Sequence, residues 1–140
     1  MKSRGKTIKI LHIDDELNQL DFTKMFLEEI DKEVEVISKL NPEDALKDIK
    51  ESDSFDCIIS DYKMLSMNGI ELAEKVREKS SIPFILYTGQ GSEEVAERAF
   101  EAGINDYLNK EIDPSHYQIL AKRVRINVER HREQNKKSRS

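Results

Sequence analysis

Residues 55–61 read Phe-Asp-Cys-Ile-Ile-Ser-Asp, an apolar run that ends in an acid. Residues 8–15 repeat this pattern, with Ile-Lys-Ile-Leu-His-Ile followed by two aspartates, and residues 82–88 read Ile-Pro-Phe-Ile-Leu-Tyr-Thr. Runs that are apolar nearly throughout are typical of strands that are buried on both faces of a parallel sheet. These three segments therefore predict the interior of a sheet rather than its edges.

The rest of the chain alternates strand-like and helical patterns. We predict five strands, over residues 8–13, 34–37, 55–60, 82–87 and 106–109. Apolar residues recur at near-helical spacing after each strand, which predicts five helices. Asn41-Pro42 and Pro114 are expected to open helices, Asn68-Gly69 to form a turn, and Gly103 to end a helix. Five alternating strands and helices predict an α/β fold whose parallel sheet is covered on both faces.

The length and composition exclude several classes of protein. A chain of 140 residues fits one domain, and its single cysteine, Cys57, excludes a disulfide framework and a cysteine-based zinc site. We expect Cys57 to be a buried small hydrophobic residue. No apolar run approaches the roughly 18 residues of a membrane helix. The run after the basic N-terminus is shorter than a signal-peptide core of about 7–15 residues, so we expect a cytoplasmic protein.

The net charge of −5 is unevenly distributed. Residues 122–140 carry eight Lys or Arg and two Asp or Glu, a net charge of +6, so the remaining residues carry −11. An acidic body argues against nucleic-acid binding, which depends on cationic contacts to phosphates. We interpret the basic segment as a solvated helix end, where cations suit the helix dipole. We expect one domain over residues 1–130 and a basic polar tail over 131–140.

Polar side chains follow four of the five predicted strands. In an open α/β sheet, ligands bind beyond the carboxyl ends of the strands. The residues at those ends are Asp14, Asp15, Asp61, Thr88 and Lys110. Each of them alone is typical of a cap, a turn or a solvated position. Together they place three acids, a hydroxyl and an amine at one edge of the sheet.

This set of groups suits phosphoryl chemistry. Clustered carboxylates repel one another and raise a pKa unless a cation lies between them. Mg²⁺ resolves the repulsion, because it binds carboxylates together with water and phosphate oxygens. A carboxylate can also attack phosphorus and form an aspartyl-phosphate. The metal, the Lys110 ammonium and the Thr88 hydroxyl could neutralise charge on the phosphoryl oxygens.

Five short motifs occur in order at the strand ends. They are Asp14-Asp15, Asp61-Tyr62-Lys63-Met64, Asn68-Gly69, Thr88-Gly89 and Asp106-Tyr107-Leu108-Asn109-Lys110. With these motifs, the chain resembles the receiver domain of two-component response regulators (the CheY-like superfamily) from about Ile8 to Val128. No single motif is decisive, but the ordered set is specific. The resemblance implies a flavodoxin-like (βα)5 fold, a doubly wound five-stranded parallel sheet with strand order 2-1-3-4-5.

The resemblance implies a role for each matching position in the site. Asp61 would be the phosphoacceptor, and Lys110 would pair with the phosphoryl group. Asp14 and Asp15 would hold Mg²⁺ together with Asp61 and the backbone carbonyl of Lys63. The phosphoryl donor would be a sensor histidine kinase or a phosphotransfer protein. The chain would catalyse its own phosphorylation and slow dephosphorylation without being an enzyme that turns over a metabolite.

The resemblance also implies a switch. Thr88 would turn toward the phosphoryl group as a catalytic and switch residue, and Tyr107 would shift inward with it. The surface of the fourth helix, fifth strand and fifth helix would then change partners, with a homodimer through this surface as one outcome. Ile119 and Ile126 are either a second packed edge of the last helix or part of that partner surface.

Two positions depart from the family pattern. Leu65 stands where a proline is common, which is expected to loosen the loop without removing a ligand. Glu111 replaces the proline after Lys110, in a bond that is often cis in the family. A cis bond before a non-proline residue is unfavourable by about 2.5–4 kcal/mol, so Lys110 either reaches the site across a trans bond or holds strain. Lys63 and Gln90 resemble positions that tune the lifetime of the acyl phosphate.

Two other functions stay open. A degenerate receiver could act as a phosphorylation-independent scaffold, which Glu111 favours and the intact polar cluster disfavours. A phosphohydrolase of the haloacid dehalogenase class would use Asp14 as its nucleophile, but Glu16 and Asn18 match that pattern poorly. The three histidines are expected to be structural or exposed, since their spacing offers no metal pair and no nucleophile–base arrangement. The output and the pathway are not readable from the sequence.

Overall fold

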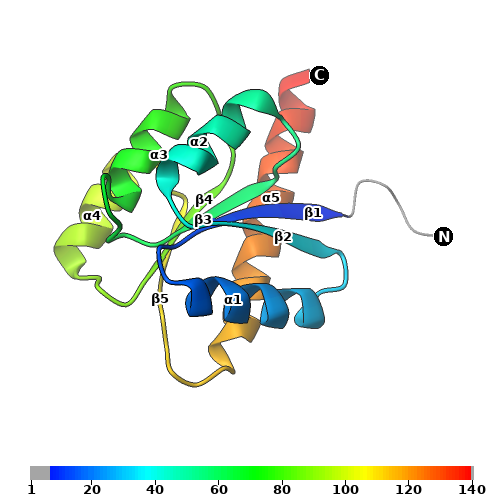
Figure 1. Cartoon of the computed structure of the whole chain (residues 1–140). Helices are drawn as coiled ribbons and strands as arrows, with labels where there is room; N and C mark the ends of the chain where they lie inside the picture. The colour runs from blue at the N-terminus through cyan, green and yellow to red at the C-terminus, as the bar shows by residue number, and fades with distance from the viewer. Residues whose placement is uncertain (1–6, 140) are drawn as a thin grey trace.

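Five parallel strands form a single sheet in the computed structural model, which describes residues 7–139 and the side chains of residues 7–137. The strands are β1 (Ile8–Ile13), β2 (Val34–Lys39), β3 (Cys57–Ser60), β4 (Phe84–Thr88) and β5 (Asp106–Asn109). Their spatial order is β2-β1-β3-β4-β5. The predicted doubly wound parallel sheet is therefore confirmed (Figure 1).

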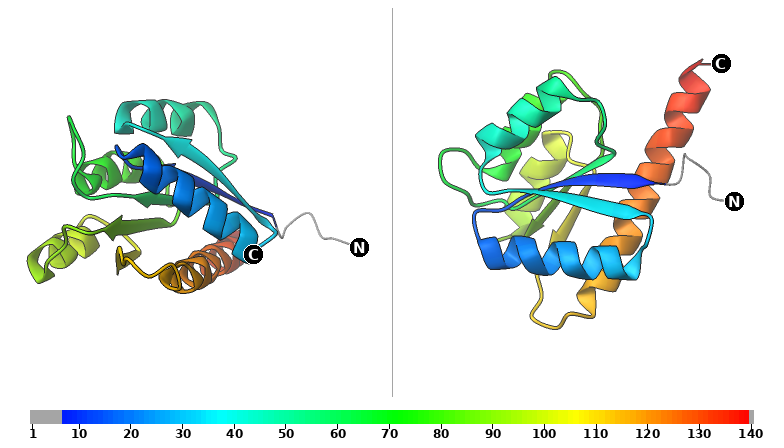
Figure 2. Two further views of the ribbon diagram at one scale, coloured as in Figure 1. Left: turned by 60° about the horizontal axis from the view of Figure 1, so that its bottom comes forward. Right: turned by 45° about the vertical axis from the view of Figure 1, so that its right-hand side comes forward.

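Five helices alternate with the strands and cover both faces of the sheet. They are α1 (Leu17–Ile30), α2 (Pro42–Glu51), α3 (Gly69–Arg77), α4 (Glu93–Glu101) and α5 (His116–Arg139). Figures 1 and 2 show α1 and α5 on one face and α2, α3 and α4 on the other. A helix follows each strand along the chain. Because the strands are parallel, the loops between each strand and the next helix all lie at the same edge of the sheet.

The central strands have apolar side chains on both faces, as their composition predicts. The face beneath α1 and α5 includes Ile10, Cys57, Ile59, Ile85 and Tyr87. The opposite face includes Leu11, Ile13, Ile58, Phe84 and Leu86. Full burial of such a side chain contributes roughly 1.5–3 kcal/mol, so these two layers anchor the sheet rigidly. Cys57 is a fully buried free thiol whose pKa is raised by burial, in agreement with the expectation of an inert residue.

Two central strands begin later than their apolar runs predict. The fourth strand begins at Phe84 rather than at Ile82, because Pro83 has no N–H to donate to a neighbouring strand. The carbonyl of Pro83 still accepts a hydrogen bond from the Ile58 amide at 2.8 Å. The third strand begins at Cys57, because the amide of Lys9 donates to the Asp56 carboxylate at 2.8 Å instead of to a strand partner.

The predicted turn at Asn68-Gly69 is wrong, because these residues start α3. The Asn68 side chain accepts from the Glu71 amide, and the Glu71 carboxylate accepts from the Asn68 amide, both at 2.8 Å. This reciprocal pair is a capping box, whose Asn-x-x-Glu spacing is visible in the sequence. The predicted cap at Asn41, by contrast, is confirmed, since its side chain accepts from the Asp44 amide at 2.9 Å.

The last helix also differs at its start. It begins at His116 rather than at Pro114, because the amides of His116 and Tyr117 bond to carbonyls three residues earlier and form a tighter turn first. At its other end α5 continues across residue 131 to Arg139, so the described part of the basic tail is helical. The division between a domain and a tail at this point stays a prediction. Within residues 7–139, no helix is both long and apolar enough to cross a membrane.

Candidate functional site

The carboxyl edge of the sheet gathers the predicted polar residues from four strands. Asp14 and Asp15 follow β1, Asp61 follows β3, Thr88 ends β4, and Lys110 follows β5. The backbone of this edge is itself bonded, since the Asp61 amide donates to the Ile13 carbonyl and the Lys110 amide donates to the Thr88 carbonyl, both at 3.0 Å. Parallel pairing therefore holds groups that are far apart in sequence at one place.

Three carboxylates form a cluster at this edge. Each of Asp14, Asp15 and Asp61 places one oxygen within 4.8 Å of the others. Asp14 is fully buried and Asp61 is 7% exposed, whereas Asp15 is exposed to solvent. Carboxylate oxygens with one solvent-facing member suit a hard divalent cation that keeps several waters. The residues present therefore fit a Mg²⁺ ion.

Backbone amides orient the two buried carboxylates. Oδ1 of Asp14 accepts from the Glu16 amide at 2.9 Å, and Oδ1 of Asp61 accepts from the Tyr62 amide at 2.7 Å. Their Oδ2 atoms are therefore left to face Lys110. The sequence analysis missed both amides, although the bond from the Glu16 amide to Asp14, two residues earlier, is a common turn motif.

Lys110 bridges the two buried carboxylates. Its Nζ lies 2.7 Å from Oδ2 of Asp14 and 3.0 Å from Oδ2 of Asp61. Burial alone would lower the pKa of Lys110, but its bonds to the two acids outweigh this effect and raise it. Burial raises the pKa of Asp14, and the nearby ammonium only partly offsets the rise. A cationic Lys110 thus neutralises part of the negative charge at the centre of the site.

The peptide bond between Lys110 and Glu111 is trans. No peptide bond among the described residues is cis. The Lys110 side chain still reaches Asp14 and Asp61. Replacement of the family's proline by Glu111 therefore does not displace the lysine from the site.

An open pocket of about 560 Å³ gives access to this cluster. Its lining includes Asp61, Lys110, the two predicted lifetime-tuning residues Lys63 and Gln90, and Leu65. Leu65 is 80% exposed at the rim. The loop that carries it is closed by a hydrogen bond of 2.7 Å from the Gly69 amide to the Tyr62 carbonyl. A second molecule can therefore approach Asp61 from solvent.

Neither of the two predicted switch residues, Thr88 and Tyr107, is among the residues that line this pocket. Thr88 is fully buried, and its hydroxyl accepts from the Gln90 amide at 3.1 Å. Tyr107 is half-buried, and its hydroxyl lies 1.3 Å from the point where a Cβ on Gly91 would stand. Gly91 therefore provides the space that the Tyr107 phenol occupies, which the sequence analysis did not foresee.

His12 lies on β1, two residues before Asp14. It is fully buried, and neither ring nitrogen has a hydrogen-bond partner among the described residues. Burial, and then the charge of Lys110, lower the pKa of His12 to about 3. The imidazole is therefore neutral and adds no positive charge beside Lys110. His12 is structural, as expected.

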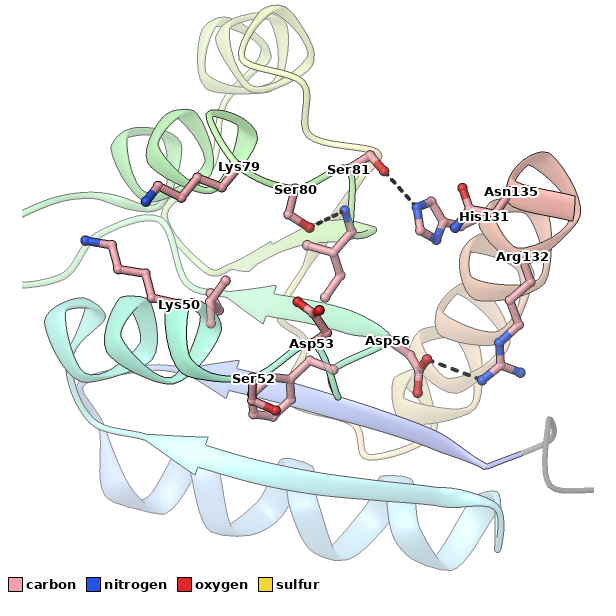
Figure 3. Close-up of a pocket in the computed structure, with 13 residues that line it drawn as sticks. Lys50, Ser52, Asp53, Asp56, Lys79, Ser80, Ser81, His131, Arg132 and Asn135 are labelled. Atoms are coloured by element: carbon pink, nitrogen blue, oxygen red, sulfur yellow. Dashed lines mark hydrogen bonds and ion pairs between the residues drawn. The ribbon is translucent and has the colours of Figure 1, made fainter. Parts of the chain in front are cut away.

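A second pocket, of about 620 Å³, lies at the opposite end of the sheet, beside the last turns of α5 (Figure 3). The side chains of Ser81 and His131 are hydrogen-bonded at 3.0 Å, and Arg132 pairs with Asp56 at 3.4 Å. Figure 3 marks both contacts with dashed lines. These contacts join the end of α5 to the segments that precede β3 and β4. This pocket is therefore the seam where α5 docks, remote from the carboxylate cluster.

Comparison with known proteins identifies the family. The family model of the response regulator receiver domain matches residues 10–122. The transcriptional regulatory protein ResD of Bacillus subtilis is 33% identical over 106 residues, which cover 76% of this chain and 43% of ResD. The cyclic di-GMP phosphodiesterase response regulator RpfG of Xanthomonas campestris is 34% identical over 110 residues, which cover 76% of this chain and 29% of RpfG. The chain thus spans less than half the length of either relative.

A solved structure agrees over nearly the whole fold. The CheY-like response regulator receiver domain protein of Methanospirillum hungatei has a TM-score of 0.79 and 27% identity, over 91% of this chain and 98% of that chain. The strand order, the acidic edge and these matches point to one conclusion. The chain belongs to the response regulator receiver domain family of two-component signal transduction.

Proposed function

We propose that this chain accepts a phosphoryl group on Asp61, from a sensor histidine kinase or a phosphotransfer protein. The observation that carries the proposal is the bridge from Lys110 to Asp14 and Asp61, at 2.7 and 3.0 Å, at the bottom of an open pocket. A scaffold has no physical need for a half-buried ammonium between two buried acids, because charged groups are expensive to desolvate. A receiver needs them to stabilise the charge of a phosphoryl group.

The two oxygens of Asp61 have different partners, which supports a different role for each in the proposed reaction. Oδ1 is held by the Tyr62 amide, so Oδ2 is the nucleophile. As the O–P bond forms, the P–N bond to the donor imidazole breaks and its electron pair returns to the ring nitrogen. Lys110 pairs with the free Asp61 carboxylate before the transfer, and its ammonium would pair with the phosphoryl oxygens afterwards. No proton has to leave Asp61, because its carboxylate already carries the reacting electron pair.

Asp14, Asp15, Asp61 and the backbone carbonyl of Lys63 would hold Mg²⁺ at this site. When bound, the ion supplies positive charge that the carboxylate cluster and the incoming phosphoryl group both require. The cluster of oxygens within 4.8 Å supports this assignment. The nucleophile of the alternative phosphohydrolase would be Asp14, but that residue is fully buried and does not line the open pocket, whereas Asp61 does, so Asp61 is favoured.

The phosphoryl group would act on the rest of the domain through Thr88 and Tyr107. We propose that the surface of α4, β5 and α5 then changes its partners, including a second copy of the chain. Exposed apolar side chains on this surface support the proposal: Phe100 on α4, and Ile119 and Ile126 on α5. Nucleic acid is disfavoured as a partner because the cationic side chains of Arg123 and Arg125 are paired with acids of the same domain. The proposed donors work in the cytoplasm, and we assign the chain to the same compartment.

The test is phosphorylation by acetyl phosphate with Mg²⁺, followed by intact mass. The parent chain should gain one phosphoryl group, and the gain should vanish in Asp61→Asn and without Mg²⁺. Asp21→Asn is the matched control, because Asp21 is an exposed acid on α1. Its phosphorylation should equal that of the parent.

The outcomes distinguish a receiver that accepts a phosphoryl group from a phosphorylation-independent scaffold. A parent chain that gains no phosphoryl group, from acetyl phosphate or from a phosphorylated donor, would support the scaffold. A gain that persists in Asp61→Asn would move the nucleophile to another acid.

A further inference from the structure

Tyr87 lies between the site and the start of α5. It is the penultimate residue of β4, next to Thr88, and it is 1% exposed among the side chains beneath α1 and α5. Nζ of Lys110 stands over its ring, 5.8 Å from the ring centroid. An ammonium within about 6 Å of an aromatic face is attracted by the ring quadrupole. The ammonium therefore has two carboxylates and the face of this ring among its neighbours.

The Tyr87 ring is itself held in place. Its hydroxyl bonds to Nε2 of His116, and the two rings stack with centroids 5.7 Å apart. His116 lies 4.2 Å from the Tyr117 ring, and Tyr117 bonds to Gln19 of α1 at 3.1 Å. The contacts run from β4 through the start of α5 to α1. The ring thus cannot turn without disturbing both helices.

The direction of the Tyr87–His116 bond follows from the other ring nitrogen. Nδ1 of His116 lies 2.8 Å from the carbonyl oxygen of Asp113, which can only accept. In the neutral imidazole Nδ1 therefore carries the proton and Nε2 accepts from Tyr87. Burial raises the pKa of Tyr87, so its hydroxyl keeps the proton that this bond requires.

We propose that Tyr87 is a positioning residue for Lys110, whose ring face holds the ammonium between Asp14 and Asp61. A lysine side chain is long and has many rotamers, so carboxylates alone leave it several ways to reach them. The fixed aromatic face removes those that point away from Oδ2 of Asp61. The inference rests on the proposed function only where phosphorylation is the readout, because the placement of Lys110 is measurable by itself.

Three variants test the proposal. Tyr87→Leu removes the ring face, Tyr87→Phe keeps it and removes the hydroxyl, and Phe26→Leu is the matched control. Phe26 stacks on Tyr117 in the same aromatic group, with centroids 4.9 Å apart, so its loss perturbs the core without removing the face over Lys110. Thermal unfolding of each variant would set a temperature at which all of them are folded.

The first readout is the initial rate of phosphorylation by acetyl phosphate with Mg²⁺. A cation–π contact multiplies the population of the correctly placed ammonium by a factor of about 2 to 30. Because the rate depends on this population, Tyr87→Leu should be phosphorylated roughly fivefold more slowly than the parent. Tyr87→Phe should stay within about twofold of the parent, and so should Phe26→Leu. A Tyr87→Leu rate equal to the parent's, or an equal loss in Phe26→Leu or Tyr87→Phe, would overturn the proposal.

The second readout is the NMR signal of the Lys110 ε-protons, assigned by its loss in Lys110→Ala. The ring current of Tyr87 should displace this signal from the ordinary lysine position in the parent and in Tyr87→Phe, and the displacement should vanish in Tyr87→Leu. A signal unmoved in Tyr87→Leu refutes the placement. If the parent is not phosphorylated at all, the proposed function fails while this measurement still decides the role of Tyr87.

Discussion

Gly69, the first residue of α3, is in close contact with the backbone of the phosphoacceptor. A Cβ on this residue would stand 2.3 Å from the carbonyl oxygen of Asp61 and 2.6 Å from Cδ1 of Leu86. The Gly69 amide also donates to the Tyr62 carbonyl at 2.7 Å, so the helix cannot simply move away. We predict that Gly69→Ala destabilises the protein and displaces Asp61.

The magnitude follows from the contact that must open. A distance of 2.3 Å has to increase beyond 3.0 Å, and the obstacle is backbone rather than the end of a flexible side chain. Overpacking of this kind typically costs about 1–3 kcal/mol, and the lower chain entropy of alanine offsets up to about 1 kcal/mol. A net loss of about 1.5 kcal/mol would lower Tm by roughly 5 °C in a domain of this size. A displacement of Asp61 approaching 1 Å would slow phosphorylation by about tenfold or more.

The assay is urea unfolding of Gly69→Ala beside Gly89→Ala. Gly89 belongs to the same edge of the sheet, but its added Cβ would meet only Cβ of Lys110, at 3.9 Å, which is ordinary contact. Gly89→Ala should keep its free energy of unfolding within about 0.5 kcal/mol of the parent. If Gly69→Ala is as stable as Gly89→Ala, the close approach to Asp61 is not a constraint and the reasoning fails.

Two further predictions concern the residues around the site. Below about pH 6.5 the unfolded chain protonates His12 while the folded chain, with a His12 pKa of about 3, does not, so acid favours unfolding. His12→Leu should therefore lose roughly 1.5 kcal/mol less than the parent between pH 6.5 and 5, measured by urea unfolding in EDTA, and equal losses would contradict this account. Gly91→Ala places a methyl where the Tyr107 hydroxyl lies, so it should displace the ring and shift its NMR signals. Because the ring can rotate, the free energy of unfolding should fall by less than about 1 kcal/mol, and unmoved Tyr107 signals would contradict the prediction.

Local patterns in the sequence are sufficient to predict the class of fold and most of its elements. The strands at 8–13 and 106–109 have the predicted bounds, because alternation and apolar runs are properties of neighbouring residues. The helix cap at Asn41 is equally local. The bounds of β3 and β4 differ because ladder pairing depends on the neighbouring strand. The predicted turn at Asn68-Gly69 is wrong because Asn-Gly is typical of turns, whereas here Asn68 and Glu71 form the capping box that starts α3.

The sequence also determined which chemical groups reach the edge of the sheet, since the position after a strand is a local fact. It did not determine how those groups meet. The bridge between Lys110 and Asp61 joins residues 49 apart, and its length depends on the packing of three strands. Which carboxylate oxygen faces the lysine depends on the backbone amides of Glu16 and Tyr62.

The role of Tyr87 illustrates the same limit. In the sequence it is one more residue of a buried strand, and nothing in the local pattern predicts a contact between its ring and Lys110. The tertiary structure places one face of its ring toward Lys110 and its hydroxyl against His116, because β4, β5 and α5 converge there. The sequence by itself determined the family, the strand order and the set of reactive groups, because these follow from pattern and from resemblance. Only the tertiary structure decided distances, burial and partners, because these arise when elements far apart along the chain pack against one another.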